Sequence, residues 1–322
     1  MWFLELVVGL YILMIVAVIW VLFRSDADLV LLFKEKFGDV PESLAGQVVW
    51  ITGASSGIGE YTAYRLAKAG CRLVLSARRR DELERVKEAC IIAGEGKIND
   101  NDVLVMVLDS VQYESHKEAV QQVLHHFNKI DILVNNAGRS QRASWIDIEL
   151  SVDRELFELN VLGPVSLTQE VLPHMIERKR GQIVVTSSIV GKVGLPHSRS
   201  YDGSKFALQG YYECLRTEMG QHNVGVTILC PGPVFSNALE TASTAKAGEF
   251  LGKSMAGTDN RMTTDRCAHL IAVAVANKMY EVWITQNPWL ILLYLYQYCP
   301  DMARWMFMKF GVKLLMTMRE GH

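Results

Sequence analysis

Apolar residues recur through the middle of the chain in short runs, and longer amphipathic stretches lie between them. The short runs of β-branched and aliphatic residues predict buried strands, and the stretches between them predict helices. The expected strands are residues 47–52, 72–77, 103–108, 130–134, 182–186, 224–229 and 281–285. The expected helices are residues 60–69, 81–93, 113–127, 151–179, 201–221 and 264–278. This alternation predicts an α/β fold with a doubly wound parallel sheet, Rossmann-like and formed by a single domain over residues 46–285.

The first residues of the chain have a different pattern. No charged residue stands between Leu6 and Phe23, and this stretch at about 1.5 Å per residue makes roughly 27 Å of helix, close to the hydrocarbon thickness of a bilayer. The alternative is a cleaved secretory signal, but no Lys or Arg precedes the apolar run and no small-residue cleavage site follows it. We therefore expect residues 1–24 to be a retained, single-pass membrane anchor and residues 25–45 to be a juxtamembrane linker or helix.

The charges beside the apolar run bear on its orientation. Arg24, Lys34 and Lys36 follow the run and no cation precedes it, which favours a body in the cytosol by the positive-inside rule. Three acidic residues are interleaved with these cations, so the side of the membrane stays undecided.

The last part of the chain, residues 286–322, is predicted to be an apolar helical extension. Trp289 to Tyr298 is an apolar-aromatic run, Pro300 interrupts it, and residues 302–318 are rich in Met, Trp and Phe. Ten residues are too few to cross a bilayer, so these helices are expected to lie in the membrane interface or to cover a pocket. The alternative is a tail that caps the core or packs in a dimer.

Composition excludes several classes of function. The 322 residues carry a formal net charge of −2, which argues against nucleic acid as a partner, and 50% of them are hydrophobic. The six cysteines are widely scattered, without a Cys-x-x-Cys pair or a His pair at metal-ligand spacing. We expect free, buried thiols rather than a disulfide framework or a zinc site, and no metal.

A glycine-rich turn follows the first expected strand directly. Gly53, Gly57 and Gly59 stand in a G-x-x-x-G-x-G spacing, and the first expected helix comes next. Glycines in this position let the backbone approach a pyrophosphate, and the helix N-terminus faces its charge. A glycine triplet is also common in plain loops, but the strand-to-helix context favours a dinucleotide cofactor.

Three arginines end the second expected strand, at Arg78, Arg79 and Arg80. This is the place where an acidic residue would hold the ribose 2′-hydroxyl of NAD, and a cation there suits a 2′-phosphate instead. The pattern therefore favours NADP and NADPH as cofactor. The alternative is the basic start of a helix on a solvated surface.

Tyr201 and Lys205 are four residues apart in an expected helix, so they share one of its faces. A neighbouring ammonium stabilises a phenolate, and an oxidised nicotinamide ring would add further positive potential. The pair is a candidate acid–base site, although the same spacing also occurs on solvated helix faces.

Other polar residues stand at the ends of strands or in apolar surroundings. Ser188 follows the fifth expected strand, and residues 135–138 (Asn-Asn-Ala-Gly) follow the fourth. Asn160 lies among apolar residues of the 151–179 stretch and needs hydrogen-bond partners, so it is either a structural cross-link or part of a polar relay. Residues 235–262 are small, polar and without pattern, as is typical of a mobile lid.

These residues together resemble the short-chain dehydrogenase/reductase family. The resemblance runs from about Gly46 to Thr285 and rests on motifs in the family's order and at compatible spacing. The motifs are Thr52-Gly53-x-x-x-Gly57-x-Gly59, Asn135-Asn136-Ala137-Gly138, Asn160, Ser188, Tyr201-x-x-x-Lys205 and Pro231-Gly232. The apolar first segment and several shorter stretches resemble a membrane-bound branch of the family found in the endoplasmic reticulum, which implies that location.

The resemblance implies roles for individual residues. It makes Tyr201 the proton donor and acceptor, Lys205 its cationic neighbour and a ligand of the nicotinamide ribose, and Ser188 a hydrogen-bond partner of the substrate oxygen. It makes Asn160 a support of Lys205 through a water. The implied cofactor contacts are Gly53, Ser55, Ser56, Gly57, Ile58, Gly59, Arg78, Arg79, Asp109, Asn136, Ala137, Gly138, Tyr201, Lys205, Val234 and Ser236. Two positions depart from the family pattern, because Gly203 replaces a usual alanine and Ser236 a frequent threonine.

We therefore expect a membrane-anchored, NADPH-dependent carbonyl reductase of lipophilic ketones or aldehydes, such as steroids, retinoids or xenobiotics. An NAD-dependent alcohol, hydroxysteroid or retinol dehydrogenase is the nearest alternative. A non-catalytic membrane scaffold is an alternative of another class, but a scaffold has no evident need for the Ser, Tyr and Lys set. The long helices at 151–179 and 201–221 are surfaces through which relatives commonly dimerise, so a homodimer is a further expectation.

Overall fold

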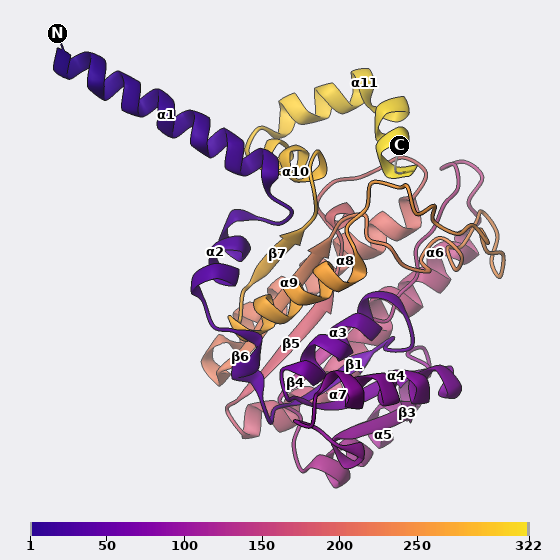
Figure 1. Ribbon diagram of the computed structural model, residues 1–322. Helices are drawn as coiled ribbons and strands as arrows, with labels where there is room; N and C mark the ends of the chain where they lie inside the picture. The colour runs from indigo at the N-terminus through magenta and orange to yellow at the C-terminus, as the bar shows by residue number, and fades with distance from the viewer. Residues whose placement is uncertain (1, 321–322) are drawn as a thin grey trace.

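One parallel sheet forms the centre of the molecule, and helices cover both of its faces (Figure 1). The computed structural model describes residues 2–320, and within them seven strands pair in the order β3-β2-β1-β4-β5-β6-β7. The strands are β1 (Val48–Thr52), β2 (Arg72–Ala77), β3 (Val103–Val107), β4 (Ile132–Asn135), β5 (Gly181–Thr186), β6 (Val224–Pro231) and β7 (Glu281–Ile284). The strand order reverses between β1 and β4. The predicted α/β, doubly wound, Rossmann-like sheet is therefore confirmed.

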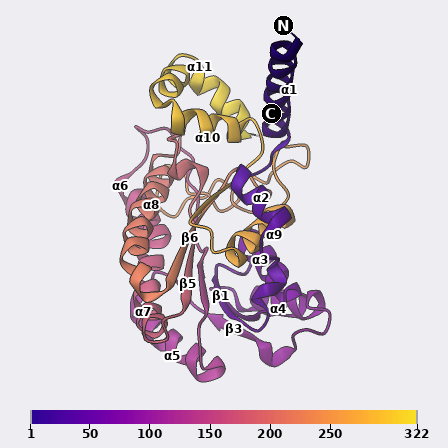
Figure 2. The ribbon, with the colours of Figure 1, turned by 90° about the vertical axis from the view of Figure 1, so that its left-hand side faces the viewer.

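The helices lie in two layers, one on each face of the sheet (Figures 1 and 2). The layer on one face consists of α3 (Gly57–Lys68), α4 (Arg80–Ala93) and α9 (Thr264–Ala276). The layer on the other face consists of α5 (His116–Phe127), α7 (Gly163–Glu177) and α8 (Arg199–Met219). Short 3-10 turns lie at η2 (Asp100–Asp102), η3 (Tyr113–Ser115), η5 (Ile189–Gly191) and η6 (Gly220–His222).

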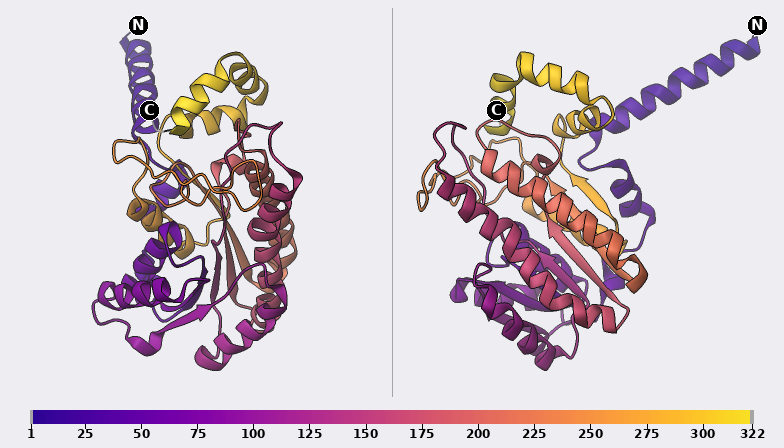
Figure 3. Two further views of the ribbon diagram at one scale, coloured as in Figure 1. Left: turned by 90° about the vertical axis from the view of Figure 1, so that its right-hand side faces the viewer. Right: turned by 180° about the vertical axis from the view of Figure 1, so that it is seen from behind.

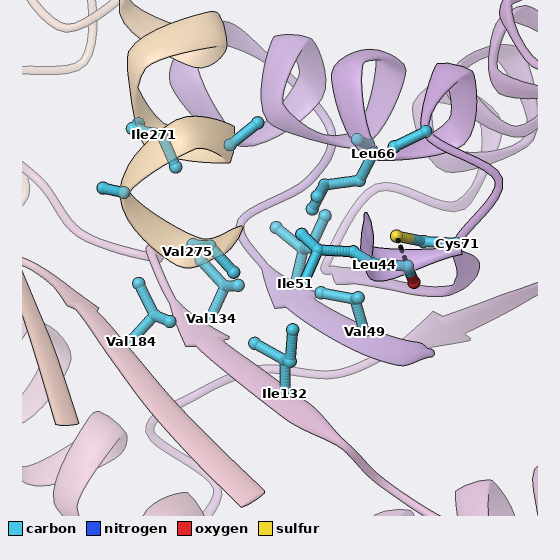
Figure 4. Packing of buried hydrophobic residues seen from close by; sticks show 14 of the residues in the cluster. Leu44, Val49, Ile51, Leu66, Cys71, Ile132, Val134, Val184, Ile271 and Val275 are labelled. Carbon is cyan, nitrogen blue, oxygen red and sulfur yellow. Dashed lines mark hydrogen bonds between the residues drawn. The ribbon is translucent and has the colours of Figure 1, made fainter. Parts of the chain in front are cut away.

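The residues of β1 explain why both faces are covered. Val49 and Ile51 point into the core beneath α3 and α9, as Figure 4 shows, whereas Val48 and Trp50 pack against the opposite layer. All four side chains are fully buried. Because successive residues of a strand point to opposite faces, a continuous apolar strand can be stable only between two helical layers.

The stretch predicted as one long helix over 151–179 is interrupted. It consists of α6 (Leu150–Phe157), a π-helical turn over Glu158–Leu162, and α7. Asn160 lies in this turn and is fully buried. A π turn places an extra residue in the helix and turns its side chains to new directions, a feature that often marks functional sites.

Residues 25–45 form part of the domain rather than an extended connection. They contain α2 (Leu29–Phe37) and the short turn η1 (Pro41–Leu44), and Leu31 is fully buried in the core under α9. Arg266 of α9 forms ion pairs with Asp26, at 2.8 Å, and with Glu35. The Asp28 carboxylate accepts hydrogen bonds from the backbone N–H groups of Leu31 and of Trp283 in β7.

The amino-terminal helix α1 (Trp2–Arg24) extends away from the domain (Figure 1). Apolar side chains along it are exposed, among them Trp2, Leu10, Leu13 and Phe23. Among the helices of residues 2–320 as described, none is both long and apolar enough to cross a membrane.

The carboxyl-terminal extension forms two helices at the same end of the molecule as α1 (Figures 2 and 3). These are α10 (Trp289–Tyr298) and α11 (Pro300–Glu320). The Asn287 side chain donates hydrogen bonds to the carbonyl oxygens of Leu22, at 2.6 Å, and of Phe23, at 3.1 Å. Asn287 therefore caps the carboxyl end of α1 and fixes it beside the start of α10.

The cysteines are free, as predicted, but not all of them are buried. Cys71, Cys90, Cys230 and Cys267 lie in the interior, whereas Cys214 and Cys299 are exposed. The prediction of burial was wrong for these two, because Cys214 lies on the outer surface of α8 and Cys299 lies between α10 and α11.

Candidate active site

The glycine-rich turn connects β1 to α3 and brings the backbone close to the end of β4. Gly53 has φ +65°, and a Cβ there would lie 2.8 Å from the Cα of Ala137. A Cβ on Gly59 would lie 2.5 Å from both the Gly53 carbonyl oxygen and the Asn136 side-chain nitrogen. Since no side chain larger than hydrogen fits at these two positions, the turn can lie directly against the segment that follows β4. The first turn of α3 then begins at Gly57, three residues earlier than predicted.

The Thr52 hydroxyl fixes the segment that follows β4. Its oxygen accepts hydrogen bonds from the backbone N–H groups of Asn136 and Ala137, both at 3.0 Å. The Asn136 side chain donates in turn to the Thr52 carbonyl oxygen at 3.1 Å. The buried Thr52 side chain therefore provides the acceptor for two backbone N–H groups that lie beyond the end of β4. It thereby sets the path of residues 136–138.

Asn160 joins the same segment to α8. Its side-chain oxygen accepts a hydrogen bond from the Arg139 backbone N–H at 2.8 Å, and its side-chain nitrogen donates to the Arg139 carbonyl oxygen at 2.9 Å. The same nitrogen donates to the Ser204 hydroxyl at 2.9 Å. Of the two interpretations of Asn160 from the sequence, these contacts match the structural cross-link. The predicted support of Lys205 through a water stays a prediction.

Tyr201 and Lys205 lie on one face of α8, and their side chains are close together. The Lys205 ammonium is 5.6 Å from the centroid of the Tyr201 ring and donates a hydrogen bond to the Thr186 carbonyl oxygen at 2.8 Å. Burial lowers the pKa of Lys205 to about 8. The ammonium is therefore still mostly charged at neutral pH and lies where it can stabilise negative charge on the Tyr201 phenol.

Ser188 lies just after β5, at the start of the turn η5. Its hydroxyl donates to the Pro231 carbonyl oxygen at 3.1 Å and accepts from the Val190 backbone N–H at 3.3 Å. These contacts fix the oxygen at the end of the sheet, beside the segment that follows β6.

α8 is continuous at Gly203, the position where relatives usually carry alanine. The helix runs from Arg199 to Met219, and a Cβ on Gly203 would have only ordinary contacts with Phe157 at 3.7 Å. The buried Asp202 carboxylate accepts hydrogen bonds from the Leu195 backbone N–H and the Ser198 hydroxyl. These bonds hold the start of the helix.

A cleft of about 600 Å³ opens at the carboxyl ends of the strands and brings most of the predicted residues together. Two predicted residues, Gly59 and Asn160, do not line it; Gly59 lies against the Gly53 carbonyl oxygen, and Asn160 donates a hydrogen bond to Ser204. The predicted residues that line the cleft are Gly53, Ser55, Ser56, Gly57, Ile58, Arg78, Arg79, Asp109, Asn136, Ala137, Gly138, Ser188, Tyr201, Lys205, Val234 and Ser236.

The two ends of the cleft differ in chemistry. Arg78, Arg79 and Asp109 lie at the ends of β2 and β3, and Arg79 donates to the Ser55 hydroxyl at 3.2 Å. Near Ser188 and Tyr201 the wall is apolar and includes Leu195 and Trp289. The cleft therefore has a cationic end and an apolar end, with the Tyr201 and Lys205 pair towards the latter.

Residues 235–262 cross the cleft without regular secondary structure, and backbone bonds tie them to the loop after β4. The Ser243 N–H donates to the Ser140 carbonyl oxygen at 2.9 Å, and its carbonyl oxygen accepts from the Arg142 N–H at 2.8 Å. Ser236 lies against the glycine turn, since a Cβ on Gly57 would be 3.3 Å from the Ser236 Cβ. The segment forms a cover over the cleft, as a lid requires; its predicted mobility stays a prediction.

The sequence pattern predicts no site role for four residues that contribute to this region: Thr52, Arg139, Thr186 and Trp289. Thr52 is the first residue of the glycine motif, but the motif does not predict its hydrogen bonds to residues 136 and 137. Arg139 follows residues 136–138 directly, and a cation at the end of a strand was the same signal that identified Arg78. Trp289 begins α10 of the carboxyl-terminal extension, for which the sequence predicts a place in the membrane interface or over a pocket but singles out no residue.

Comparison with known proteins agrees with this geometry. A family model described as short chain dehydrogenase matches residues 47–247. The chain therefore belongs to the short-chain dehydrogenase family, whose Rossmann-like domains bind a nicotinamide cofactor and whose members are oxidoreductases.

Particular relatives are similar over nearly the whole chain. Dehydrogenase/reductase SDR family member 7 from Homo sapiens is 47% identical over 300 residues, which cover 92% of this chain and 88% of that protein. The protein of the same name from Mus musculus is 45% identical over 301 residues, with 92% and 88% covered. A solved structure of an alcohol dehydrogenase from the archaeon Thermococcus sibiricus, complexed with 5-hydroxy-NADP, has a TM-score of 0.64 and 25% identity, and the match covers 75% of this chain and 97% of that chain.

The Thr52 contacts lead to a first prediction. Thr52→Val keeps the shape of the side chain but leaves the N–H groups of Asn136 and Ala137 without an acceptor, so the free energy of unfolding should fall by about 1–3 kcal/mol. Thr52→Ser keeps the hydroxyl, so its free energy of unfolding should fall by less. Urea unfolding of the two variants in detergent measures the difference; equal losses would show that the hydroxyl is not what stabilises this junction.

Proposed function

We propose that the protein is an NADPH-dependent carbonyl reductase that acts on lipophilic ketones or aldehydes. The observation that carries the proposal is the convergence of Ser188, Tyr201 and Lys205 in one cleft with the glycine turn. A hydroxyl, a phenol and an ammonium at the apolar end of a dinucleotide cleft fit proton transfer to a carbonyl oxygen. The family resemblance of the sequence implies steroids, retinoids and carbonyl xenobiotics as substrate classes.

Each residue of the site would have its own role in carbonyl reduction. When bound, the reduced nicotinamide supplies the hydride. Ser188 would turn its O–H from the Pro231 carbonyl to the substrate oxygen and hold it, while Tyr201 would give that oxygen its proton. Lys205 would stabilise the phenolate that remains and would hold the nicotinamide ribose. Asn160 would keep this arrangement in place through Ser204 and, as predicted, through a water at Lys205.

The cleft fits a dinucleotide in its backbone as well as in its charges. Gly53 and Gly59 lie where a Cβ would collide with the backbone, so the turn is bare enough for a pyrophosphate to approach the amino end of α3. Arg78 and Arg79, which follow β2 at the cationic end of the cleft, favour a 2′-phosphate and hence NADP. The similar alcohol dehydrogenase complexed with 5-hydroxy-NADP supports the same cofactor class.

An NAD-dependent alcohol, hydroxysteroid or retinol dehydrogenase is the nearest rival, because the same residues catalyse the reverse reaction. A non-catalytic membrane scaffold is the rival of another class. Both rivals are distinguished by activity with each cofactor. Detergent-solubilised protein is assayed for NADPH and NADH oxidation against a panel of lipophilic carbonyl compounds, and for NADP and NAD reduction against the matching alcohols.

Tyr201→Phe removes the phenolic proton and should lower turnover by a factor of about 10² to 10⁴ or more, since a positioned acid contributes that much. NADPH binding should persist, because the ring and Lys205 remain. Tyr211→Phe is the matched control on the same helix, with a half-exposed ring outside the cleft. Stopped-flow assays and fluorescence titration measure the two quantities. Full turnover in Tyr201→Phe would remove Tyr201 from the mechanism.

Trp289→Ala removes most of an apolar wall near Ser188, and Trp289 is only 6% exposed. Because burying a large apolar side chain is worth about 1.5–3 kcal/mol, KM for bulky lipophilic ketones should rise roughly tenfold or more, with a smaller change in kcat. The KM of Trp289→Phe should lie between those of the wild type and Trp289→Ala. Tyr298 is exposed on the same helix, so the KM of Tyr298→Ala should match that of the wild type. An unchanged KM for the bulky ketones would place the substrate elsewhere.

We further propose that α1 is a single-pass anchor in the endoplasmic reticulum membrane. The exposed apolar side chains of α1 support the proposal, because lipid is the surroundings that such a surface fits. In cell fractions, alkaline carbonate should leave the full chain in the membrane pellet and release a variant that lacks residues 1–24. Release of the full chain by carbonate would contradict an inserted anchor.

A further inference from the structure

Arg139 places a guanidinium in the cleft, and this group has an unusual environment. Its backbone is fixed on both sides by the Asn160 side chain, and its side chain is half-buried. The guanidinium carbon lies 4.7 Å from the centroid of the Phe250 ring. Within residues 2–320, no hydrogen-bond acceptor or ion-pair partner is found for its N–H donors.

Such a group is costly to keep in a half-buried place. A ring contact satisfies none of the five N–H donors of a guanidinium, and burial removes part of their hydration. Burial lowers the pKa of Arg139, and the nearby positive charge of Arg78 lowers that pKa further. Asp109 and Glu155 attract Arg139 only from beyond ion-pair distance. The free protein therefore holds two like charges near one another.

The other arginines of the cleft have partners. Arg79 donates to Ser55, Arg142 to the Ser140 hydroxyl and the Gln141 carbonyl oxygen, and Arg261 to Asp259. Arg78 is different, since the described part of the chain offers its guanidinium neither a hydrogen-bond acceptor nor an ion-pair partner. Among the residues that the structure describes, Arg78 and Arg139 are thus the cleft arginines without an acceptor, and their like charges repel each other.

Their positions indicate which anion would join them. Arg78 follows β2 and Arg139 follows the end of β4, and β1 lies between these strands in the sheet. The two side chains therefore approach the cleft from opposite sides. The charge of Arg139 interacts with that of Glu155 on α6, and also with those of Arg78 and Asp109, which lie at the ends of β2 and β3. Under the proposed function, this is the end that receives the adenosine half of the cofactor.

We propose that Arg139 is a second ligand of the 2′-phosphate of NADP and, together with Arg78, selects this cofactor over NAD. The inference rests on the proposed function. A phosphate dianion accepts charge-assisted hydrogen bonds from two guanidinium groups and cancels their mutual repulsion. The glycine turn and the amino end of α3 provide for the pyrophosphate separately. The Phe250 ring then holds Arg139 from the side of the covering segment.

The test uses two small probes that differ by one phosphate group. Calorimetry with the detergent-solubilised full chain measures the binding of 2′,5′-ADP and of 5′-AMP. Arg139→Met keeps an apolar stem and should weaken 2′,5′-ADP at least about tenfold while 5′-AMP changes less than about twofold, because only the former carries the 2′-phosphate. Arg139→Lys should recover part of the loss.

Arg80→Met is the matched control, because it makes the same substitution at an arginine beside Arg78 and Arg79 whose side chain does not line the cleft. Its affinity for both probes should stay within about twofold of the wild type. Thermal unfolding without ligand should show Arg139→Met to be at least as stable as the wild type, since the variant removes a cation that repels Arg78.

Two results would overturn the inference. Equal weakening of both probes in Arg139→Met would assign Arg139 to the 5′-phosphate or the adenosine, and unchanged binding of 2′,5′-ADP would exclude a phosphate contact. Either result leaves carbonyl reduction by the wild-type protein intact. Failure of the proposed function would instead appear as absent turnover with every substrate of the panel.

Discussion

The pairing of β1 with β4 is the contact on which the cleft depends. In the sheet, Val49 pairs with Ile132 and Ile51 with Val134, although more than 80 residues of sequence separate them. At the end of this pair, Thr52 binds the backbone of residues 136 and 137, and Gly53 leaves no side chain between the two segments. A ligand can approach here because the chain turns away in opposite directions from β1 and from β4.

The end of the cleft that contains Tyr201 and Lys205 is held by a chain of hydrogen bonds that starts at the same place. Residues 136–138 lead to Arg139, Asn160 binds the Arg139 backbone, and Ser204 of α8 binds Asn160. Lys205 is the next residue of α8, and its ammonium reaches the carbonyl at the end of β5. The position of the ammonium is therefore set by contacts to three separate segments. Burial of this network in a region of low dielectric makes each of its polar contacts stronger.

The carboxyl-terminal extension connects the cleft to the far end of the molecule. Asn287 binds the last carbonyl groups of α1, and Trp289, two residues further, lines the cleft beside the turn that follows Ser188. The family match ends at residue 247, so this wall is added by a part of the chain outside that match. An apolar wall next to the helix that extends from the domain is consistent with substrates that partition into lipid.

The sequence by itself determined the elements and the class of the fold. Apolar runs of strand length can be stable only between two helical layers, which predicts the parallel sheet and its helices. The glycine turn between the first strand and the first helix predicts the dinucleotide-binding class of the fold. Tyr201 and Lys205 were also predictable, because helical spacing alone places them on one face.

Only the tertiary structure decided how distant residues meet. The π turn at Asn160, the partners of Thr52 and the place of Trp289 depend on packing between segments that no local pattern relates. The same is true of Arg139. Its position after a strand was visible in the sequence, but two features arise from the path of two loops across the sheet: its guanidinium has no acceptor among the described residues, and its charge interacts with that of Arg78. Sequence patterns predict local geometry. The charges and walls of a cleft come from segments far apart in the sequence, and only folding brings these segments together.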